Sequence, residues 1–400
     1  MKKFFYNQKM IMKYRKDVIA NNLSIFNDES LTDIEFVENL GVTQLLIKWC
    51  SGIMINNVPQ NMAELTISNC ALQSIDNIGD LAQLQLLDLS KNNILRVEVL
   101  TKLNKLKTLV LNDNININLQ QVGQLVQLRE LSLDSIGFSE IQFLDKLTNL
   151  QFLSMNQNKI TNISSISQLK QLEKLYLSEN QISEISSLKT LKKLTTLILN
   201  KNIIYNFDLY NLTSLISLEL NDNFLTNLHP ISSLKNLQVL LLDNNNITEI
   251  YPLRNLTSLY KLNLKNNRIT DLYCLKNLIH LRSLCLNKNR VINIQPLLQL
   301  NFDFLYLQHN YIQQFYKLQV ENIFQDDQEN APAELKLLNS KIEAIHDVSL
   351  LQNKQCQMNN KQLFQQQIAK IGIYLQGVQN TMIQLSSIFA MSFQEEIPSQ

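Results

Sequence analysis

The chain has 400 residues, with 36 Lys and Arg against 35 Asp and Glu, so its formal net charge is +1. This balance gives no overall field that would recruit nucleic acid, a membrane surface or an acidic substrate. A single core usually stops growing at about 250–300 residues. Leu makes up about 18% and Asn about 12% of this chain, which has only 7 Gly, so its length and composition favour an open repeat architecture.

Residues 1–22 are predicted to form a basic helix. Met10, Ile11, Tyr14 and Val18 can share one apolar face, while six lysines and arginines lie around it. A cap over the first unit of the repeat is the favoured role, because a repeat array must cover its exposed end. Contact with a membrane surface or with nucleic acid is the alternative.

Residues 23–318 carry an internal repeat with the pattern LxxLxLxxNxIxxIxxLxx. The spacing is 22 residues except for 20 at the first step and 21 before Asn223 and Asn310. We refer to the Asn position of this pattern as the Asn slot. It is occupied in order by Cys50, Cys70, Asn92, Asn114, Ile136, Asn158, Asn180, Asn202, Asn223, Asn245, Asn267, Asn289, Asn310 and, after an insertion, Ser340.

Physical chemistry alone predicts how such units stack. In LxL, two inward leucines flank one outward residue, which is typical of a very short strand with one buried face. One unit cannot bury its own apolar stripe. Stacked in parallel, the units form a continuous Leu/Ile column, and the segment after the two Ile positions returns on the outer side as a 3-10 or short helical turn.

The motif from about Leu45 to Phe315 resembles the leucine-rich repeat. The 22-residue form with Ile after Asn is similar to the class that contains the regulatory subunit of type 1 protein phosphatase and the bacterial internalins. The Asn/Gln-rich texture also resembles repeat proteins of some protists. The resemblance implies a right-handed α/β solenoid with short parallel strands on the concave face, 3-10 or short helical segments on the convex face, and terminal helices.

The Asn slot is predicted to be structural. A carboxamide supplies both a donor and an acceptor to backbone groups that the turn leaves without partners. The alternative, a metal or catalytic ladder, is disfavoured. Ile136 cannot form such bonds, so we expect an irregular turn at Ile136 and Gly137.

The outward strand positions predict a partner-binding surface on the concave face. Four residues before the slot, large apolar or aromatic side chains recur where a solvated sheet would be polar. Two residues before the slot, the side chains stay polar or charged, as in the rim of a protein interface. The predicted partner-binding residues are Phe152, Tyr176, Ile198, Leu241, Cys285, Phe304 and Tyr306. Isolated exposed apolar residues are the alternative interpretation.

The chain after residue 318 is predicted to contain an acidic insertion (319–334), a degenerate last repeat (335–351) and a C-terminal helix (352–400). The helix carries a heptad seam, which either caps the last repeat or self-associates as a coiled coil in a homodimer. The seam consists of Phe364, Ile368, Ile371, Leu375, Val378, Met382, Leu385 and Phe389.

No catalytic motif is present, and the four histidines fall at unrelated positions of different repeats, so we expect no enzyme, metal site or cofactor. Cys274 and Cys285 are interpreted as ordinary small residues rather than a redox or metal pair.

Five scattered cysteines, no signal peptide and no apolar run of transmembrane length favour a cytoplasmic location. The leading hypothesis is a protein-interaction scaffold, resembling a regulatory subunit, with a protein partner of unknown identity. The alternatives are an internalin-like surface adhesion protein and a structural component of a cytoskeletal or ciliary assembly.

Overall fold

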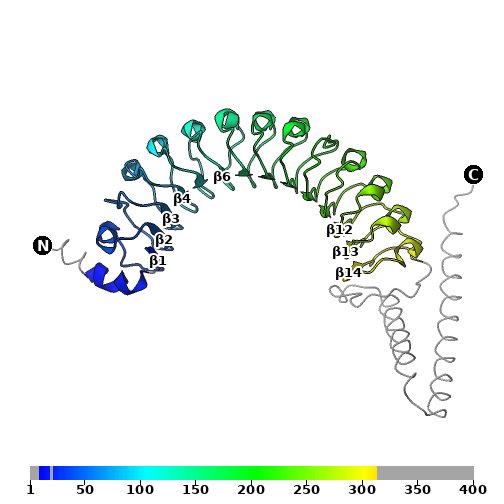
Figure 1. The fold of residues 1–400 in the computed structure, drawn as a ribbon, viewed down its shortest axis with the longest axis horizontal. Helices are drawn as coiled ribbons and strands as arrows, with labels where there is room; N and C mark the ends of the chain where they lie inside the picture. Colours follow the sequence, from blue (N-terminus) through cyan, green and yellow to red (C-terminus); the bar gives the residue numbers. More distant parts are fainter. Residues whose placement is uncertain (1–8, 19–20, 313–400) are drawn as a thin grey trace, which may run out of the picture. The chain divides into compact units, whose positions relative to one another are not determined.

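The structure, a computed structural model, describes residues 9–18 and 21–312. Within these residues the strands form a 14-stranded sheet in which each strand pairs with the next along the chain, and every pairing is parallel, as between β1 and β2. Figure 1 shows the strands on the inner edge of a curved stack and the helical turns on its outer edge. The predicted solenoid of parallel strands and outer 3-10 turns is confirmed.

Most strands are three residues long because each repeat contributes only the LxL element to the sheet. They are β1 (Asn22–Phe26), β2 (Gln44–Lys48), β3 (Glu64–Ser68), β4 (Leu86–Asp88), β5 (Thr108–Val110), β6 (Glu130–Ser132), β7 (Phe152–Ser154), β8 (Lys174–Tyr176), β9 (Thr196–Ile198), β10 (Ser217–Glu219), β11 (Val239–Leu241), β12 (Lys261–Asn263), β13 (Ser283–Cys285) and β14 (Phe304–Tyr306).

The return segments on the outer side are 3-10 turns. They are η2 (Glu35–Leu40), η3 (Asp76–Ile78), η4 (Glu98–Lys102), η5 (Gln120–Gln124), η6 (Gln142–Lys146), η7 (Ser164–Gln168), η8 (Ser186–Thr190), η9 (His229–Ile231), η10 (Tyr251–Asn255), η11 (Tyr273–Asn277) and η12 (Gln295–Leu297), while η1 (Arg15–Asp17) precedes β1 in the N-terminal segment. Between residues 21 and 312, no such turn lies between β2 and β3 or between β9 and β10. Both of these repeats are shortened, which removes residues from the outer side.

The core is one continuous column of inward Leu and Ile side chains. The central leucines of neighbouring strands, such as Leu175, Leu197 and Leu218, pair in register and are fully buried. Stability of such an array is approximately a sum of contacts between neighbouring repeats.

The N-terminal segment packs against the first repeat. Residues 9–14 are helical, Met10 and Tyr14 are buried, and the Tyr14 ring stacks on Phe36 with centroids 5.5 Å apart. Lys13 pairs with Asp28. Hydrogen bonds and this charge hold the pKa of Asp28 below its ordinary value, although partial burial alone would raise it. The apolar face expected of this segment is therefore used inside the chain.

The predicted acidic insertion (319–334), degenerate last repeat (335–351) and C-terminal helix (352–400) lie outside the described residues.

Candidate functional site

The Asn slots form a hydrogen-bonded ladder inside the solenoid. Asn180, only 8% exposed, donates from Nδ2 to the carbonyls of Met155 at 2.9 Å and Leu177 at 3.1 Å, and its Oδ1 accepts the amide of Ile160 at 3.1 Å. Asn202 makes the same set of bonds one repeat later. The ladder therefore stabilises the backbone, and its side-chain amides form their hydrogen bonds with buried backbone groups.

Where the slot lacks Asn, the turn changes. The Cys70 thiol accepts the amide of Cys50 and donates to the carbonyl of Ser68, and burial raises the pKa of this thiol. Ile136 offers no acceptor, and the next residue, Gly137, adopts a φ of +90°. This is the irregular turn expected from the sequence.

Five of the seven predicted partner-binding residues lie in one row of the sheet, which we call the central row. The row runs through directly paired positions from β8 to β14: Tyr176, Ile198, Glu219, Leu241, Asn263, Cys285 and Tyr306. Glu219 and Asn263 interrupt the apolar set. All seven side chains are half-buried, because the strands pack closely on this inner face.

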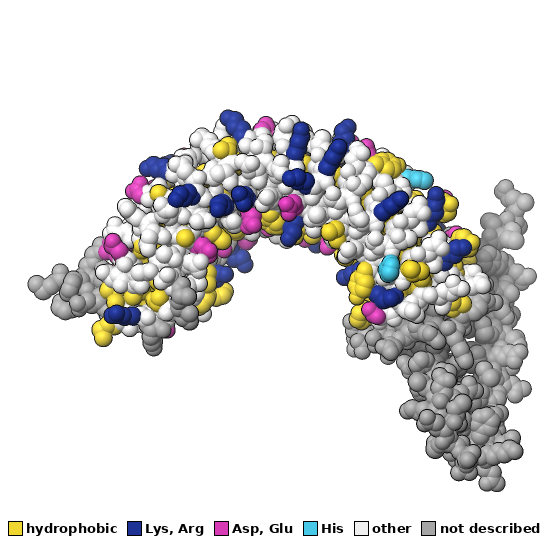
Figure 2. Space-filling model, viewed as in Figure 1, with side chains coloured by type: hydrophobic (Ala, Val, Ile, Leu, Met, Phe, Trp, Pro, Cys, Tyr) yellow, Lys and Arg dark blue, Asp and Glu magenta, His cyan; other side chains and the backbone are white. Residues whose placement is uncertain are grey.

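The other two predicted residues lie one row closer to the strand starts. Phe152 is the first residue of β7, and its ring meets Tyr176 edge-on with centroids 5.2 Å apart. Phe304, the first residue of β14, is 46% exposed and lies on the same strand as Tyr306. Figure 2 shows hydrophobic side chains along the inner edge of the arc among polar ones.

A second polar ladder, missed by the sequence analysis, runs along the concave side through positions two residues before several of the Asn slots. The Oδ1 of Asn112 accepts the amide of Asp134 at 2.8 Å, and the Oδ1 of Asp134 accepts the amide of Asn156 at 2.6 Å. Similar bonds join Asn200 to Asn221 and Asn221 to Asp243. The sequence predicted that these groups form the polar rim of a protein interface. Their oxygens accept amides of the next repeat, so their side chains are held in place.

Asp243 is the carboxylate of this ladder with a shifted pKa. Half-burial raises its pKa above the ordinary value, Asp222 and Glu219 add to this effect, and Lys265 opposes it. Its Oδ1 accepts a hydrogen bond from Asn263 at 3.1 Å. The carboxylate therefore lies next to the central row.

Two exposed aromatic pairs also lie outside the predicted set. Tyr205 and Phe224 stack with centroids 5.1 Å apart, beside the shortened repeat between β9 and β10. Phe26 and Trp49 meet at 6.0 Å at the ends of β1 and β2. The sequence signal was the presence of large aromatics at outward positions, but their pairing required the register of neighbouring repeats.

Cys274 and Cys285 are free thiols. Cys274 is buried and donates to the carbonyl of Ile250 at 3.1 Å, and burial raises its pKa to about 12. Cys285 lies in the central row, and burial also raises its pKa. In the described part of the chain, no three His, Cys, Asp or Glu side chains are grouped so that they could hold a metal ion. No helix there has the length and apolar character to cross a bilayer.

Comparison with known proteins supports the fold. Residues 235–277 match the family model described as Leucine Rich repeats (2 copies), while a comparison with curated proteins finds no match. The chain is similar to an internalin (inlF) from Listeria monocytogenes, at 29% identity and a TM-score of 0.58, over 67% of this chain and 90% of that one.

Two further solved structures share the fold. A Leptospira interrogans LRR protein is 24% identical, with a TM-score of 0.62, over 76% of this chain and 93% of that one. The plant peptide hormone receptor RGFR1, in complex with RGF2, is 22% identical, with a TM-score of 0.55, over 72% of this chain and 53% of that one.

Proposed function

We propose that this chain, whose repeats share the leucine-rich-repeat fold, is a non-catalytic scaffold that binds a partner protein on its concave face. The observation that carries the proposal is the central row, in which Tyr176, Ile198, Leu241 and Tyr306 follow one line across neighbouring strands. Aromatic and aliphatic anchors surrounded by fixed polar groups are typical of protein-binding surfaces.

The physical logic is that the anchors are already ordered. The Phe152 ring contacts the Tyr176 ring edge-on, and the second polar ladder fixes Asn200, Asn221 and Asp243 beside the row. A partner that covers them loses little side-chain entropy on this side of the interface. A role as a regulatory subunit is part of this proposal, since a rigid scaffold can hold a second protein without contributing catalysis.

We propose a cytoplasmic location for this scaffold. The four described cysteines, Cys50, Cys70, Cys274 and Cys285, are free thiols, as expected in a reducing compartment. The similarity to the internalin inlF favours a second candidate, a surface adhesion protein. Cell fractionation separates the two: recovery with the soluble cytoplasmic fraction supports the first, and recovery at the cell surface supports the second.

The binding proposal is tested with the full chain as bait in affinity capture. The variant Tyr176→Ser/Ile198→Ser/Leu241→Ser/Tyr306→Ser should lose the proteins that the unaltered chain retains. Circular dichroism should show that it remains folded, because these side chains are only half-buried.

The matched control removes two aromatic rings from the convex side. Tyr251 and Tyr273 begin η10 and η11 and are 57% and 59% exposed, so Tyr251→Ser/Tyr273→Ser should capture the same proteins as the unaltered chain. If the convex variant loses them and the concave variant keeps them, the partner binds the outer face and the proposal is wrong.

A further inference from the structure

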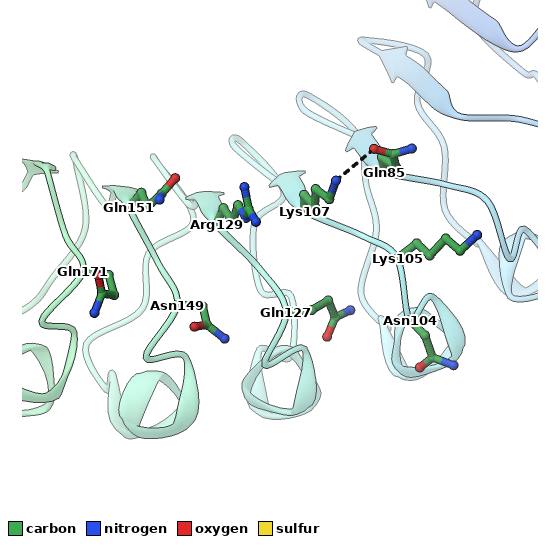
Figure 3. Close-up of a pocket in the computed structure, with 9 residues that line it drawn as sticks. All are labelled: Gln85, Asn104, Lys105, Lys107, Gln127, Arg129, Asn149, Gln151 and Gln171. Carbon is green, nitrogen blue, oxygen red and sulfur yellow. Dashed lines mark hydrogen bonds between the residues drawn. The ribbon is translucent and has the colours of Figure 1, made fainter.

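A polar cavity of about 630 Å³ lies on one side of the solenoid, away from the concave face. We call this side the strand-start flank, because its loops lead from the outer turns into the strands. Figure 3 shows the cavity across several consecutive repeats. It is lined by Gln85, Asn104, Lys105, Lys107, Gln127, Arg129, Asn149, Gln151 and Gln171.

The lining residues fall into two lines. Gln85, Lys107, Arg129 and Gln151 each come directly before a strand, from β4 to β7, and lie side by side at the upper edge of the cavity in Figure 3. Lys105, Gln127, Asn149 and Gln171 form the second line nearer the outer turns, and Asn104 precedes Lys105. The 22-residue period therefore produces an elongated polar groove that follows the stack.

The charge of this groove is unbalanced. Three of its lining residues are cations and none is a carboxylate. Lys107 donates to Gln85 Oε1 at 3.2 Å and Lys105 donates to Gln83 Oε1 at 2.6 Å, both neutral acceptors. In the part of the chain that the structure describes, Lys105, Lys107 and Arg129 take part in no ion pair.

Glu130 follows Arg129 on β6, where it accepts a hydrogen bond from Thr108 on β5 at 3.2 Å, and it forms no ion pair with a cation of the groove. A groove whose cations have no ion-pair partner raises the local concentration of anions, and Arg can hold a carboxylate with two parallel hydrogen bonds.

The remaining lining identifies the class of anion. Carboxamides offer both donors and acceptors, which suits the N–H and C=O groups of an extended peptide, whereas a phosphate needs only donors. No aromatic residue lines the cavity, so it lacks the stacking platforms on which single-stranded nucleic acids depend.

We propose that the strand-start flank binds an extended acidic peptide segment of a partner protein, with its carboxylates on Lys105, Lys107 and Arg129. Four steps between repeats at about 4.8 Å each span about 19 Å, which is the length of about six extended residues. This site is separate from the central row, so one partner could occupy both or two partners could bind together.

The test measures fluorescence anisotropy with the full chain and a labelled peptide of alternating Glu and Ser. The peptide should bind, a Gln/Ser peptide of equal length should not, and added salt should weaken binding because the contact is electrostatic. The variant Lys107→Gln/Arg129→Gln should weaken binding by about tenfold or more, since it removes two charge-assisted contacts.

The matched control is Lys192→Gln/Lys235→Gln, which removes two exposed cations from loops that do not line the cavity and should leave binding unchanged. Equal binding by both double variants, or by the Gln/Ser peptide, overturns the proposal. Displacement by inorganic phosphate alone would indicate a small-anion site. Tighter binding of polyuridylate RNA with the same dependence on Lys107 and Arg129 would indicate a nucleic-acid site, and either result is also a refutation.

Loss of the flank site is distinguishable from loss of the concave site. Lys107→Gln/Arg129→Gln should still capture partners that depend on Tyr176 and Tyr306, unless one partner uses both surfaces. In that case its isolated acidic segment should bind the unaltered chain and not the variant.

Discussion

Replacing Asn180 with Ala measures the contribution of the internal ladder. The carbonyls of Met155 and Leu177 keep other donors, because Asn158 and Asn202 also bond to them. The amide of Ile160 has only the Asn180 side chain as its acceptor. The substitution therefore leaves one buried N–H without a partner, which costs about 1–3 kcal/mol.

The measurement is urea denaturation followed by circular dichroism, with Gln181→Ala as the control. Gln181 is the exposed neighbour of Asn180, so its substitution should change the free energy of unfolding by less than about 0.5 kcal/mol. Asn180→Ala should lower the denaturation midpoint clearly. If the dependence of the free energy of unfolding on urea concentration also becomes less steep, the two halves of the stack no longer unfold together.

Asn180→Asp separates the acceptor role from the donor role. The carboxylate keeps an acceptor for Ile160 but faces the carbonyls of Met155 and Leu177, so its folded-state pKa should lie above the unfolded value. The charged form then destabilises the fold, and the deficit should shrink as the pH falls. If Asn180→Ala and Gln181→Ala have equal midpoints, or the Asp variant shows no pH dependence, the ladder does not act through these bonds.

Two other predictions concern glycine and cysteine. A Cβ on Gly123 would lie 2.4 Å from the carbonyl oxygen of Phe143, whereas Gly137 has open space around it but a φ of +90°. In urea denaturation, Gly123→Ala should therefore lower the free energy of unfolding by about 1–3 kcal/mol and Gly137→Ala by about 1 kcal/mol. A larger loss for Gly137→Ala than for Gly123→Ala would contradict this. Burial raises the pKa of Cys274 from 9.0 to about 12, so its thiol should resist alkylation near neutral pH until the chain unfolds. The stability that this buried, protonated thiol contributes is present below pH 9.0 and is lost towards pH 12, so the free energy of unfolding of Cys274→Ala should fall less steeply than that of the unaltered chain over this range. Rapid alkylation of Cys274 in the native chain would contradict its burial.

The sequence could predict the strands, outer turns and internal ladder because the 22-residue period assigns one role to each position. Leu218 and Asn180 are buried because of where they stand in the repeat. The same logic placed Tyr176 and Ile198 on the concave face.

The second ladder could not be predicted in this way. Asn112 and Asp134 resemble ordinary exposed polar residues until the register shows that an amide of the next repeat lies opposite each oxygen. The Tyr205–Phe224 stack and the groove around Lys107 also depend on contacts between repeats. A period describes one repeat at a time, so properties that arise between repeats require the structure.

The offsets of the internal ladder have an evolutionary consequence. Asn180 bonds to a carbonyl 25 residues earlier and to an amide 20 residues earlier. Asn223, which follows the shortened repeat between β9 and β10, bonds to the equivalent carbonyl 24 residues earlier and to the equivalent amide 19 residues earlier. This repeat is therefore one residue shorter after Ile204, on the way to the next strand, while the ladder has the same partners. Duplication or deletion of a whole unit would likewise join two surfaces that already match, so a lineage could lengthen or shorten the concave face without first evolving a new core.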